Sequence, residues 1–176
     1  MTKTTHRPHT ADTTSATATP ARTAVLIAAT ITTGLSAGVF YIFACAVMPA
    51  LARSDDRTYV EVMRNINTAI QNPAFFLSFM GALLLTGLSA WQLRRAPGGR
   101  RVRAALPAYA LVFLVTMAFG IPLNIALAAQ GDPAALRAHF EGPWVAWNGV
   151  RALGSTPALG LLDRALMLYG RPAHSS

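Results

Sequence analysis

Four long apolar stretches alternate with short polar segments along the chain. No charged residue occurs between Thr23 and Ala52, and none occurs in 73–93 or 104–129. Because about 20 helical residues cross the hydrocarbon core of a bilayer, each stretch is long enough to span a membrane. We predict four spans, at about 23–51, 73–93, 104–129 and 144–167.

The fourth stretch is the least regular. It is apolar on average but contains Arg151, Asp163 and Arg164, with Pro157 between them. Only eleven uncharged residues separate Arg151 from Asp163. This segment crosses the membrane only if Arg151 is accommodated inside the bundle. Three spans plus a surface helix is therefore the alternative topology.

The chain ends are polar. Residues 1–22 are rich in Thr, Ala and Pro and have almost no large apolar side chains, which is typical of a disordered tail. Residues 170–176 form a second short tail. The apolar run after residue 22 is about twice as long as that of a secretory signal. We therefore expect a retained helix rather than cleavage at Ala50-Leu51-Ala52.

The distribution of charge predicts an orientation. The segment between the second and third stretches carries five arginines and no acid: Arg94, Arg95, Arg100, Arg101 and Arg103. Positively charged loops stay in the cytoplasm, so both termini are expected there too. The net charge of +8 comes from 15 basic and 7 acidic residues, which lie mainly between apolar runs. We expect a multi-pass plasma-membrane protein that contacts membrane lipid and binds no nucleic acid; no oligomeric state is predicted.

The first outer loop has a helical pattern of its own. Tyr59, Val62, Met63, Ile66 and Ile70 recur at three- and four-residue spacing, after a capping sequence at 54–56. An amphipathic helix on the outer mouth of the bundle is expected. The predicted fold class is all-α, a four-helix transmembrane bundle with an amphipathic helix in its first outer loop.

Unusual polar residues gather at the predicted outer ends of the spans. Thr116, Gly120 and Asn124 are four apart and share one helix face, and Pro122 frees backbone carbonyls nearby. On the fourth segment the residues with i, i+4 and i+7 spacing are Trp144, Asn148 and Arg151. Trp147, four before Arg151, is expected to cover it through a cation–π contact. Polar groups inside spans usually face the bundle interior and mark a site.

Simpler interpretations exist for each of these residues. Arg151 could extend to the lipid headgroups, with Trp144 and Trp147 as an interfacial belt. Asn124 and Asn148 could form hydrogen bonds that hold helices together. Asn67 and Asn72 could be helix caps. His139 and Glu141, the only nearby acid–base pair, could be exposed and without a role.

No other chemistry is indicated. The single cysteine, Cys45, lies in an apolar run, and there is no Cys/His metal set. Neither a glycine-rich phosphate loop nor a Ser-His-Asp spacing is present. We expect no metal and no cofactor.

Four motifs in this order are similar to a family of small four-helix membrane proteins that includes the fungal anthrone oxygenases. They are AGVFYIFACAVMPAL (Ala37–Leu51), VMRNINTAIQNPAFF (Val62–Phe76), the Thr116–Asn124 segment ending in IPLN, and WVAWNGVR (Trp144–Arg151). The likeness covers about residues 30–155. The chain departs from it at Pro157, Asp163 and Arg164, where an uninterrupted apolar helix is expected.

The resemblance implies oxidation of an anthrone-like polyketide to an anthraquinone without an evident metal or flavin. Under this hypothesis Arg151, Asn124 and Asn148 are catalytic, and Arg151 stabilises a phenolate or enolate that reacts directly with oxygen. The residues expected to bind the small aromatic substrate are Trp147, Trp144, Thr116, Asn67 and Asn72. The alternative is a non-enzymatic membrane module that binds a lipid, an apolar ligand or a partner protein; a transporter is the third interpretation.

Overall fold

The computed structural model describes residues 19–170, and over them the chain is helical, with no strand. Most of the two predicted tails, 1–22 and 170–176, lies outside the described residues, and α1 already begins at Pro20. The elements are α1 (Pro20–Ile42), η1 (Phe43–Val47), α2 (Met48–Leu51), α3 (Asp56–Ala69), α4 (Pro73–Gln92), α5 (Gly99–Val115), η2 (Thr116–Gly120), α6 (Ile121–Ala128) and α7 (Pro133–Tyr169). The chain therefore folds as an all-helical protein.

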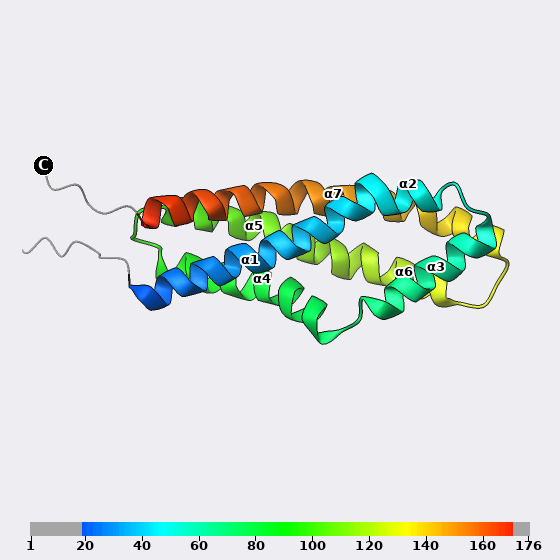
Figure 1. The fold of residues 1–176 in the computed structure, drawn as a ribbon, viewed down its shortest axis with the longest axis horizontal. Helices are drawn as coiled ribbons and strands as arrows, with labels where there is room; N and C mark the ends of the chain where they lie inside the picture. The colour runs from blue at the N-terminus through cyan, green and yellow to red at the C-terminus, as the bar shows by residue number, and fades with distance from the viewer. Residues whose placement is uncertain (1–18, 171–176) are drawn as a thin grey trace, which may run out of the picture.

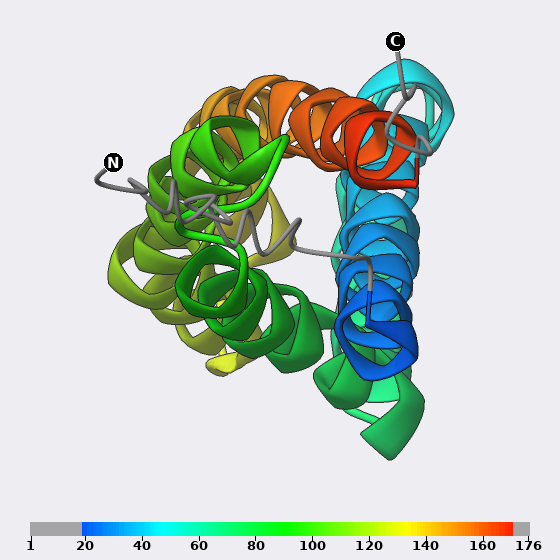
Figure 2. The same ribbon diagram turned by 90° about the vertical axis from the view of Figure 1, so that its left-hand side faces the viewer.

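The long helices form a ring around a common axis. Helix α1 packs against α4 and α7, and α5 packs against the same two helices. Figure 2 shows this ring end-on, and Figure 1 shows the helices running along the length of the molecule. Their inward faces supply one continuous apolar cluster, with Leu26, Phe79, Tyr109 and Leu162 among its members.

Three helical runs are long and apolar enough to cross a membrane: Pro20–Leu51, Pro73–Gln92 and Gly99–Ala128. Large apolar side chains are exposed along their outer faces, for example Ile31, Leu84 and Leu114. Water would penalise such a surface, whereas lipid would not. These features are those of a membrane protein.

Helix α7 is longer than the fourth apolar stretch. It begins at Pro133, eleven residues before Trp144, because Asp132 caps it by accepting a hydrogen bond from Ala135 N at 3.0 Å. Its 37 residues continue without a break through Pro143 and Pro157. A helix of this length measures about 55 Å, well beyond the thickness of a hydrocarbon core.

Helix α3 lies at the end of the molecule opposite the start of α1 and the end of α7 (Figure 1). It buries Tyr59, Val60 and Met63 and packs against α6 and α7. The burial raises the pKa of the Tyr59 hydroxyl, which stays protonated at neutral pH. No large apolar side chain of α3 is strongly exposed. The side chains that α3 buries against the bundle are therefore large and apolar.

Two arginines tie α3 and its preceding linker to the rest of this end. Arg64 donates to the carbonyls of Leu127 and Ala129 at the end of α6, at 2.8 and 2.6 Å. Arg137 of α7 donates to the carbonyls of Ala52 and Ser54 at 3.1 and 2.8 Å. Arg137 also pairs with two carboxylates, those of Asp56 at 3.0 Å and Glu141 at 2.8 Å.

We expect Arg137→Gln to loosen this end of the molecule. The variant leaves two carboxylates and two carbonyls without their charged donor, and the side chain is only 16% exposed. A loss of about 1–3 kcal/mol in the free energy of unfolding follows. Hydrogen exchange in mild detergent should show faster exchange in α3 and the 52–55 linker. The matched control is Arg57→Gln, whose pair with Glu61 is largely exposed and should leave exchange unchanged.

Candidate functional site

Two π-helical turns frame the centre of the candidate site. Each precedes a proline by the same interval: η1 begins at Phe43 before Pro49, and η2 begins at Thr116 before Pro122. A proline lacks the N–H that the carbonyl four residues earlier requires, and its ring collides with that carbonyl. Widening the preceding turn relieves the collision. The MPAL and IPLN segments therefore create two irregular turns, and both turns pack against α7.

Arg151 of α7 lies beside these turns and points into the bundle. Arg151 is only 5% exposed. Its guanidinium carbon lies 5.0 Å from the ring centroid of Phe40 and 5.1 Å from that of Trp144. A Cβ built on Gly120 of η2 would lie 2.9 Å from Arg151 Nη1. Only a glycine leaves this space. The interpretation in which Arg151 extends outward to the headgroups is therefore wrong.

The guanidinium has few polar partners. Its one side-chain hydrogen bond, from Nη2 to Asn148 Oδ1, is long at 3.4 Å, and Nε is buried with no acceptor among the described residues. The carboxylates that form ion pairs in this part of the chain pair with Arg57 and Arg137 instead. A buried cation without a counter-charge is costly in a low-dielectric interior. The site is thus electrostatically suited to an anion.

Two asparagines connect the helices around Arg151. Asn148 Nδ2 donates to the carbonyl of Phe40 on α1 at 3.0 Å. Asn124 Oδ1 on α6 accepts from Trp144 Nε1 on α7 at 3.0 Å. Both asparagines make interhelical hydrogen bonds, as the simpler interpretation predicts. They fix the ring of Trp144 and the amide of Asn148, which are the groups that contact Arg151.

The prediction that Trp147 makes the cation–π contact with Arg151 is wrong. Trp144 and Phe40 supply the two ring faces, and Trp147 stacks instead on Phe119 of η2, with 3.9 Å between ring centroids and 7° between planes. The two tryptophans are three residues apart, so they point about 60° away from one another around α7. Trp144 is also only 6% exposed, which rules out a place for it in an interfacial belt.

An apolar groove of about 290 Å³ opens beside this site. It runs between η2–α6 and α7 and is lined by Ala118, Phe119, Pro122, Leu123, Ala126, His139, Pro143 and Trp147. Phe119 is 40% exposed. Trp147 belongs both to the groove and to the helix turn before Arg151. The groove lies near Arg151, because its lining residue Phe119 is next in sequence to Gly120, which approaches Arg151 Nη1.

Among the other predicted residues, Thr116 lies near Arg151, whereas Asn67 and Asn72 belong to α3 and the N-terminal cap of α4. Asn72 is exposed and caps α4 by accepting from Phe75 N at 3.0 Å. Asn67 is on α3, where its Nδ2 is buried without an acceptor in the described chain. Thr116 donates to the Val112 carbonyl at 2.9 Å, with its methyl group close to Gly120.

The pair of His139 and Glu141 does not form an acid–base unit. Glu141 accepts from Arg137 Nε at 2.8 Å, whereas His139 lines the groove. Among the described residues no cluster of three or more His, Cys, Asp and Glu could hold a metal ion.

Sequence reasoning missed two aromatic residues at the site. Phe40 provides one ring face and one carbonyl, and Phe119 provides the ring that covers Trp147. Phe40 stood within the Ala37–Leu51 motif but had no polar character to mark it. Phe119 lies next to Gly120, and only the pairing of η2 with α7 reveals its partner.

Comparisons with known proteins give one match. The model of the anthrone oxygenase family matches residues 68–161, which is more than half of the chain. This range holds Gly120, Asn124, Trp144, Asn148 and Arg151, the residues that surround the buried guanidinium apart from Phe40. No curated protein and no solved structure matches the chain. On the family match, the chain belongs to the anthrone oxygenase family.

Proposed function

We propose that the protein oxidises an anthrone-like polyketide without a metal or organic cofactor, at Arg151. The observation that carries this proposal is the buried guanidinium held between two aromatic rings with no carboxylate beside it. A preorganised cation in a dry site stabilises an anion that forms during a reaction far more than water does. An anthrone that loses a proton becomes such an anion, an extended enolate.

The chemistry balances with dioxygen as the only oxidant. The methylene carbon of the anthrone loses a proton to water, and its negative charge moves onto the carbonyl oxygen beside Arg151. Dioxygen then forms a bond to that carbon, and protonation gives a hydroperoxide. Breaking the O–O bond with loss of water leaves the second carbonyl of the anthraquinone. Arg151 is the catalytic residue because it contacts the enolate oxygen.

His139 does not serve as the base in this proposal. It lies twelve residues before Arg151 on the same helix, about 18 Å along the axis. A tricyclic ligand whose oxygen contacts Arg151 does not extend that far. Water therefore accepts the proton, and the protein contributes by lowering the energy of the carbanion.

The groove supplies a route for a planar ligand. Phe119 stacks on Trp147, is partly exposed and belongs to a π-helical turn, a type of irregular turn common at functional sites. A flat aromatic ligand can take the place of Phe119 against Trp147, with the same stacking geometry. Trp147 is one turn, about 6 Å, from Arg151, so the ligand's oxygen end then reaches the guanidinium.

The proposed topology has four spans, with α7 as the fourth. Two observations support it: α7 packs against α1 and α5, and its opposite face exposes Val145, Leu153 and Met167. Because Arg151 faces the bundle, its charge is shielded from lipid. In this topology α3 is the amphipathic outer helix, the Leu93–Gly98 loop and both termini are cytoplasmic, and the protein is in the plasma membrane.

Turnover of anthrone by the purified full chain tests the proposal. In mild detergent with a metal chelator, we expect anthraquinone to form faster than in detergent alone, with one dioxygen consumed per anthrone. Arg164→Gln, which alters an exposed arginine on the same helix, should keep the full rate. A rate equal to the uncatalysed one would contradict the oxygenase function.

A second candidate function is binding of a planar apolar anion without turnover. The observation that favours it is that no titratable acid or base among the described residues contacts Arg151. Titrating anthrone under nitrogen and following tryptophan fluorescence separates the two. Saturable quenching combined with no acceleration in air would establish the binding module and rule out the oxygenase.

A further inference from the structure

The end of the molecule opposite α3 has an excess of positive charge. Seven arginines of the described chain lie there: Arg22, Arg94, Arg95, Arg100, Arg101, Arg103 and Arg164; Asp163 is the one acidic residue beside them. The carboxylates of Asp55, Asp56, Glu61, Asp132 and Glu141 all belong to the other end. Any anion that approaches this end meets a positive field with little internal compensation.

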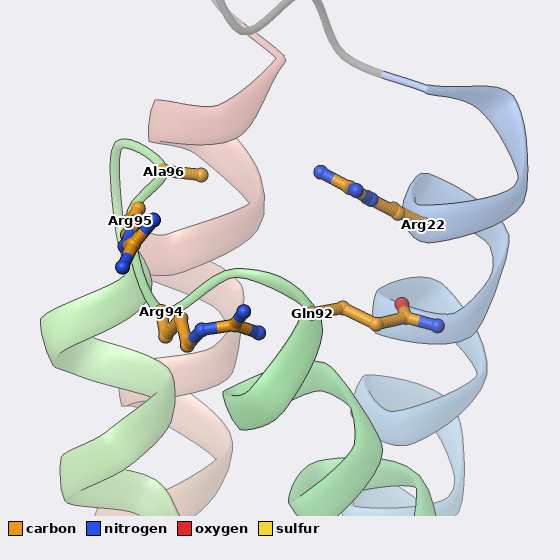
Figure 3. Close-up of a pocket in the computed structure, with 5 residues that line it drawn as sticks. All are labelled: Arg22, Gln92, Arg94, Arg95 and Ala96. Atoms are coloured by element: carbon orange, nitrogen blue, oxygen red, sulfur yellow. The ribbon is translucent and has the colours of Figure 1, made fainter.

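Part of this charge converges on a small pocket between α1 and the loop after α4. The pocket measures about 160 Å³ and is lined by Arg22, Gln92, Arg94, Arg95 and Ala96. In Figure 3, Arg22 extends from α1 toward the loop, Gln92 reaches toward α1, and Arg94 lies on the loop side and points toward the end of α4. Hydrogen bonds fix the loop side, because Arg94 donates to the Trp91 carbonyl at 2.9 Å and Arg103 to that of Arg94 at 2.7 Å.

The pocket has an unused hydrogen-bond acceptor as well as donors. Oε1 of Gln92 is buried and accepts nothing from the described residues. A buried acceptor without a donor is costly, so a ligand hydroxyl at this point would be stabilising. The pocket therefore offers cations to a phosphate and an acceptor to a neighbouring hydroxyl.

The pocket also lies at the depth of lipid headgroups. Trp91, 64% exposed, is at the end of the apolar surface of α4, and the Arg94 guanidinium lies 5.5 Å from its ring centroid. Exposed tryptophans mark the membrane–water interface, and basic pockets between helices on the cytoplasmic side bind anionic headgroups. The adjacent exposed side chains, such as Leu88, would contact the acyl chains.

We propose that this pocket binds the headgroup of an anionic phospholipid that carries a hydroxyl, of the phosphatidylglycerol type. Arg22, Arg94 and Arg95 contact the phosphate, and Gln92 accepts a hydrogen bond from the glycerol hydroxyl. The pocket volume suits a headgroup, because about 160 Å³ is the volume that about five water molecules occupy in the liquid. The lipid sits at the far end of the bundle from Arg151 and anchors the cytoplasmic side of α1 to α4.

Native mass spectrometry of the full chain in mild detergent tests the proposal with three additives: phosphatidylglycerol, phosphatidylcholine and glycerol phosphate. We expect saturable binding of phosphatidylglycerol only. The double variant R22Q/R95Q spares the hydrogen bonds of Arg94 and should weaken this binding at least tenfold, since each arginine near anionic lipid contributes about fivefold. The matched control R100Q/R164Q removes the same charge from exposed positions outside the pocket and should change it less than twofold.

The opposite outcomes would overturn the proposal. Equal weakening by the two double variants would show diffuse attraction rather than a pocket. Displacement of the lipid by glycerol phosphate alone would show a site for soluble phosphate. The hydroxyl contact has its own test: wild type should prefer phosphatidylglycerol to phosphatidylmethanol, and Gln92→Leu should remove the preference. A preference that persists in Gln92→Leu would exclude Gln92 from headgroup recognition.

Discussion

Arg151→Met is expected to stabilise the protein while removing the proposed anthrone oxidation. The guanidinium is buried, has one long hydrogen bond and has no ion-pair partner in the described chain. Replacing a poorly compensated buried charge with an apolar side chain of similar length removes a desolvation cost. We expect the free energy of unfolding to rise by about 1–3 kcal/mol in thermal unfolding in detergent. The rate of anthrone oxidation should fall about 10²- to 10³-fold, as on losing an oxyanion donor.

Two further variants define the meaning of that result. Arg164→Met changes an exposed arginine on the same helix and should affect neither stability nor rate. Arg151→Lys keeps the charge but lacks the planar group that lies between two rings, so it should retain only part of the rate. If Arg151→Met instead destabilised the protein by several kcal/mol, Arg151 would be a structural residue and the anion site would be refuted.

The apolar helices could be predicted from the sequence because lipid imposes a simple rule. A span needs about 20 uncharged residues, and the Pro73–Gln92 helix ends within one residue of the predicted 73–93. The start of α7 could not be found in this way. Residues 133–143 lie outside the apolar stretch, and their helix depends on a cap from Asp132 and on the pairing of Arg137 with Glu141. Hydropathy carries no information on such a segment.

The candidate site also has some features that the sequence predicts and others that it does not. Spacing alone placed Trp144, Asn148 and Arg151 on one face of a helix, and the structure brings these three together. The spacing could not decide whether Trp144 or Trp147 is the ring over Arg151, because a 60° rotation of the helix determines that contact. Phe40 depends on the register between α1 and α7, which no periodicity within either helix contains.

The two π-helical turns can be predicted only in part from the sequence. Pro49 and Pro122 were visible in the sequence, and their effect on the preceding backbone follows from the lost N–H. Their common consequence appears only in three dimensions. The second turn ends at Gly120, beside the guanidinium, whereas the first begins three residues after Phe40 and packs Phe43 against Trp144, whose ring lies by the same guanidinium. Each turn has one residue buried against the bundle, Phe43 in the first and Gly120 in the second, while most of its other residues are exposed.

Gly120→Ala is expected to impair function without unfolding the protein. The added Cβ would lie 2.9 Å from Arg151 Nη1, closer than real contacts allow, so the guanidinium must move from its place between Phe40 and Trp144. Alanine favours helix over glycine by about 1 kcal/mol, which offsets part of the crowding. Because misplacing a reacting group by about 1 Å costs up to about 10²-fold, we expect the rate of anthrone oxidation to fall 10- to 100-fold.

The matched control is Gly149→Ala, two residues before Arg151 on α7, where a Cβ meets nothing within 4 Å. It makes the same chemical change in a helix and should leave the rate unaltered while raising the unfolding temperature slightly. The double variant Gly120→Ala with Arg151→Met separates position from packing. If Gly120 acts through the guanidinium, adding Gly120→Ala to Arg151→Met should cause no further loss of rate. An additional tenfold loss in the double variant would show that Gly120 acts on the ligand by another route.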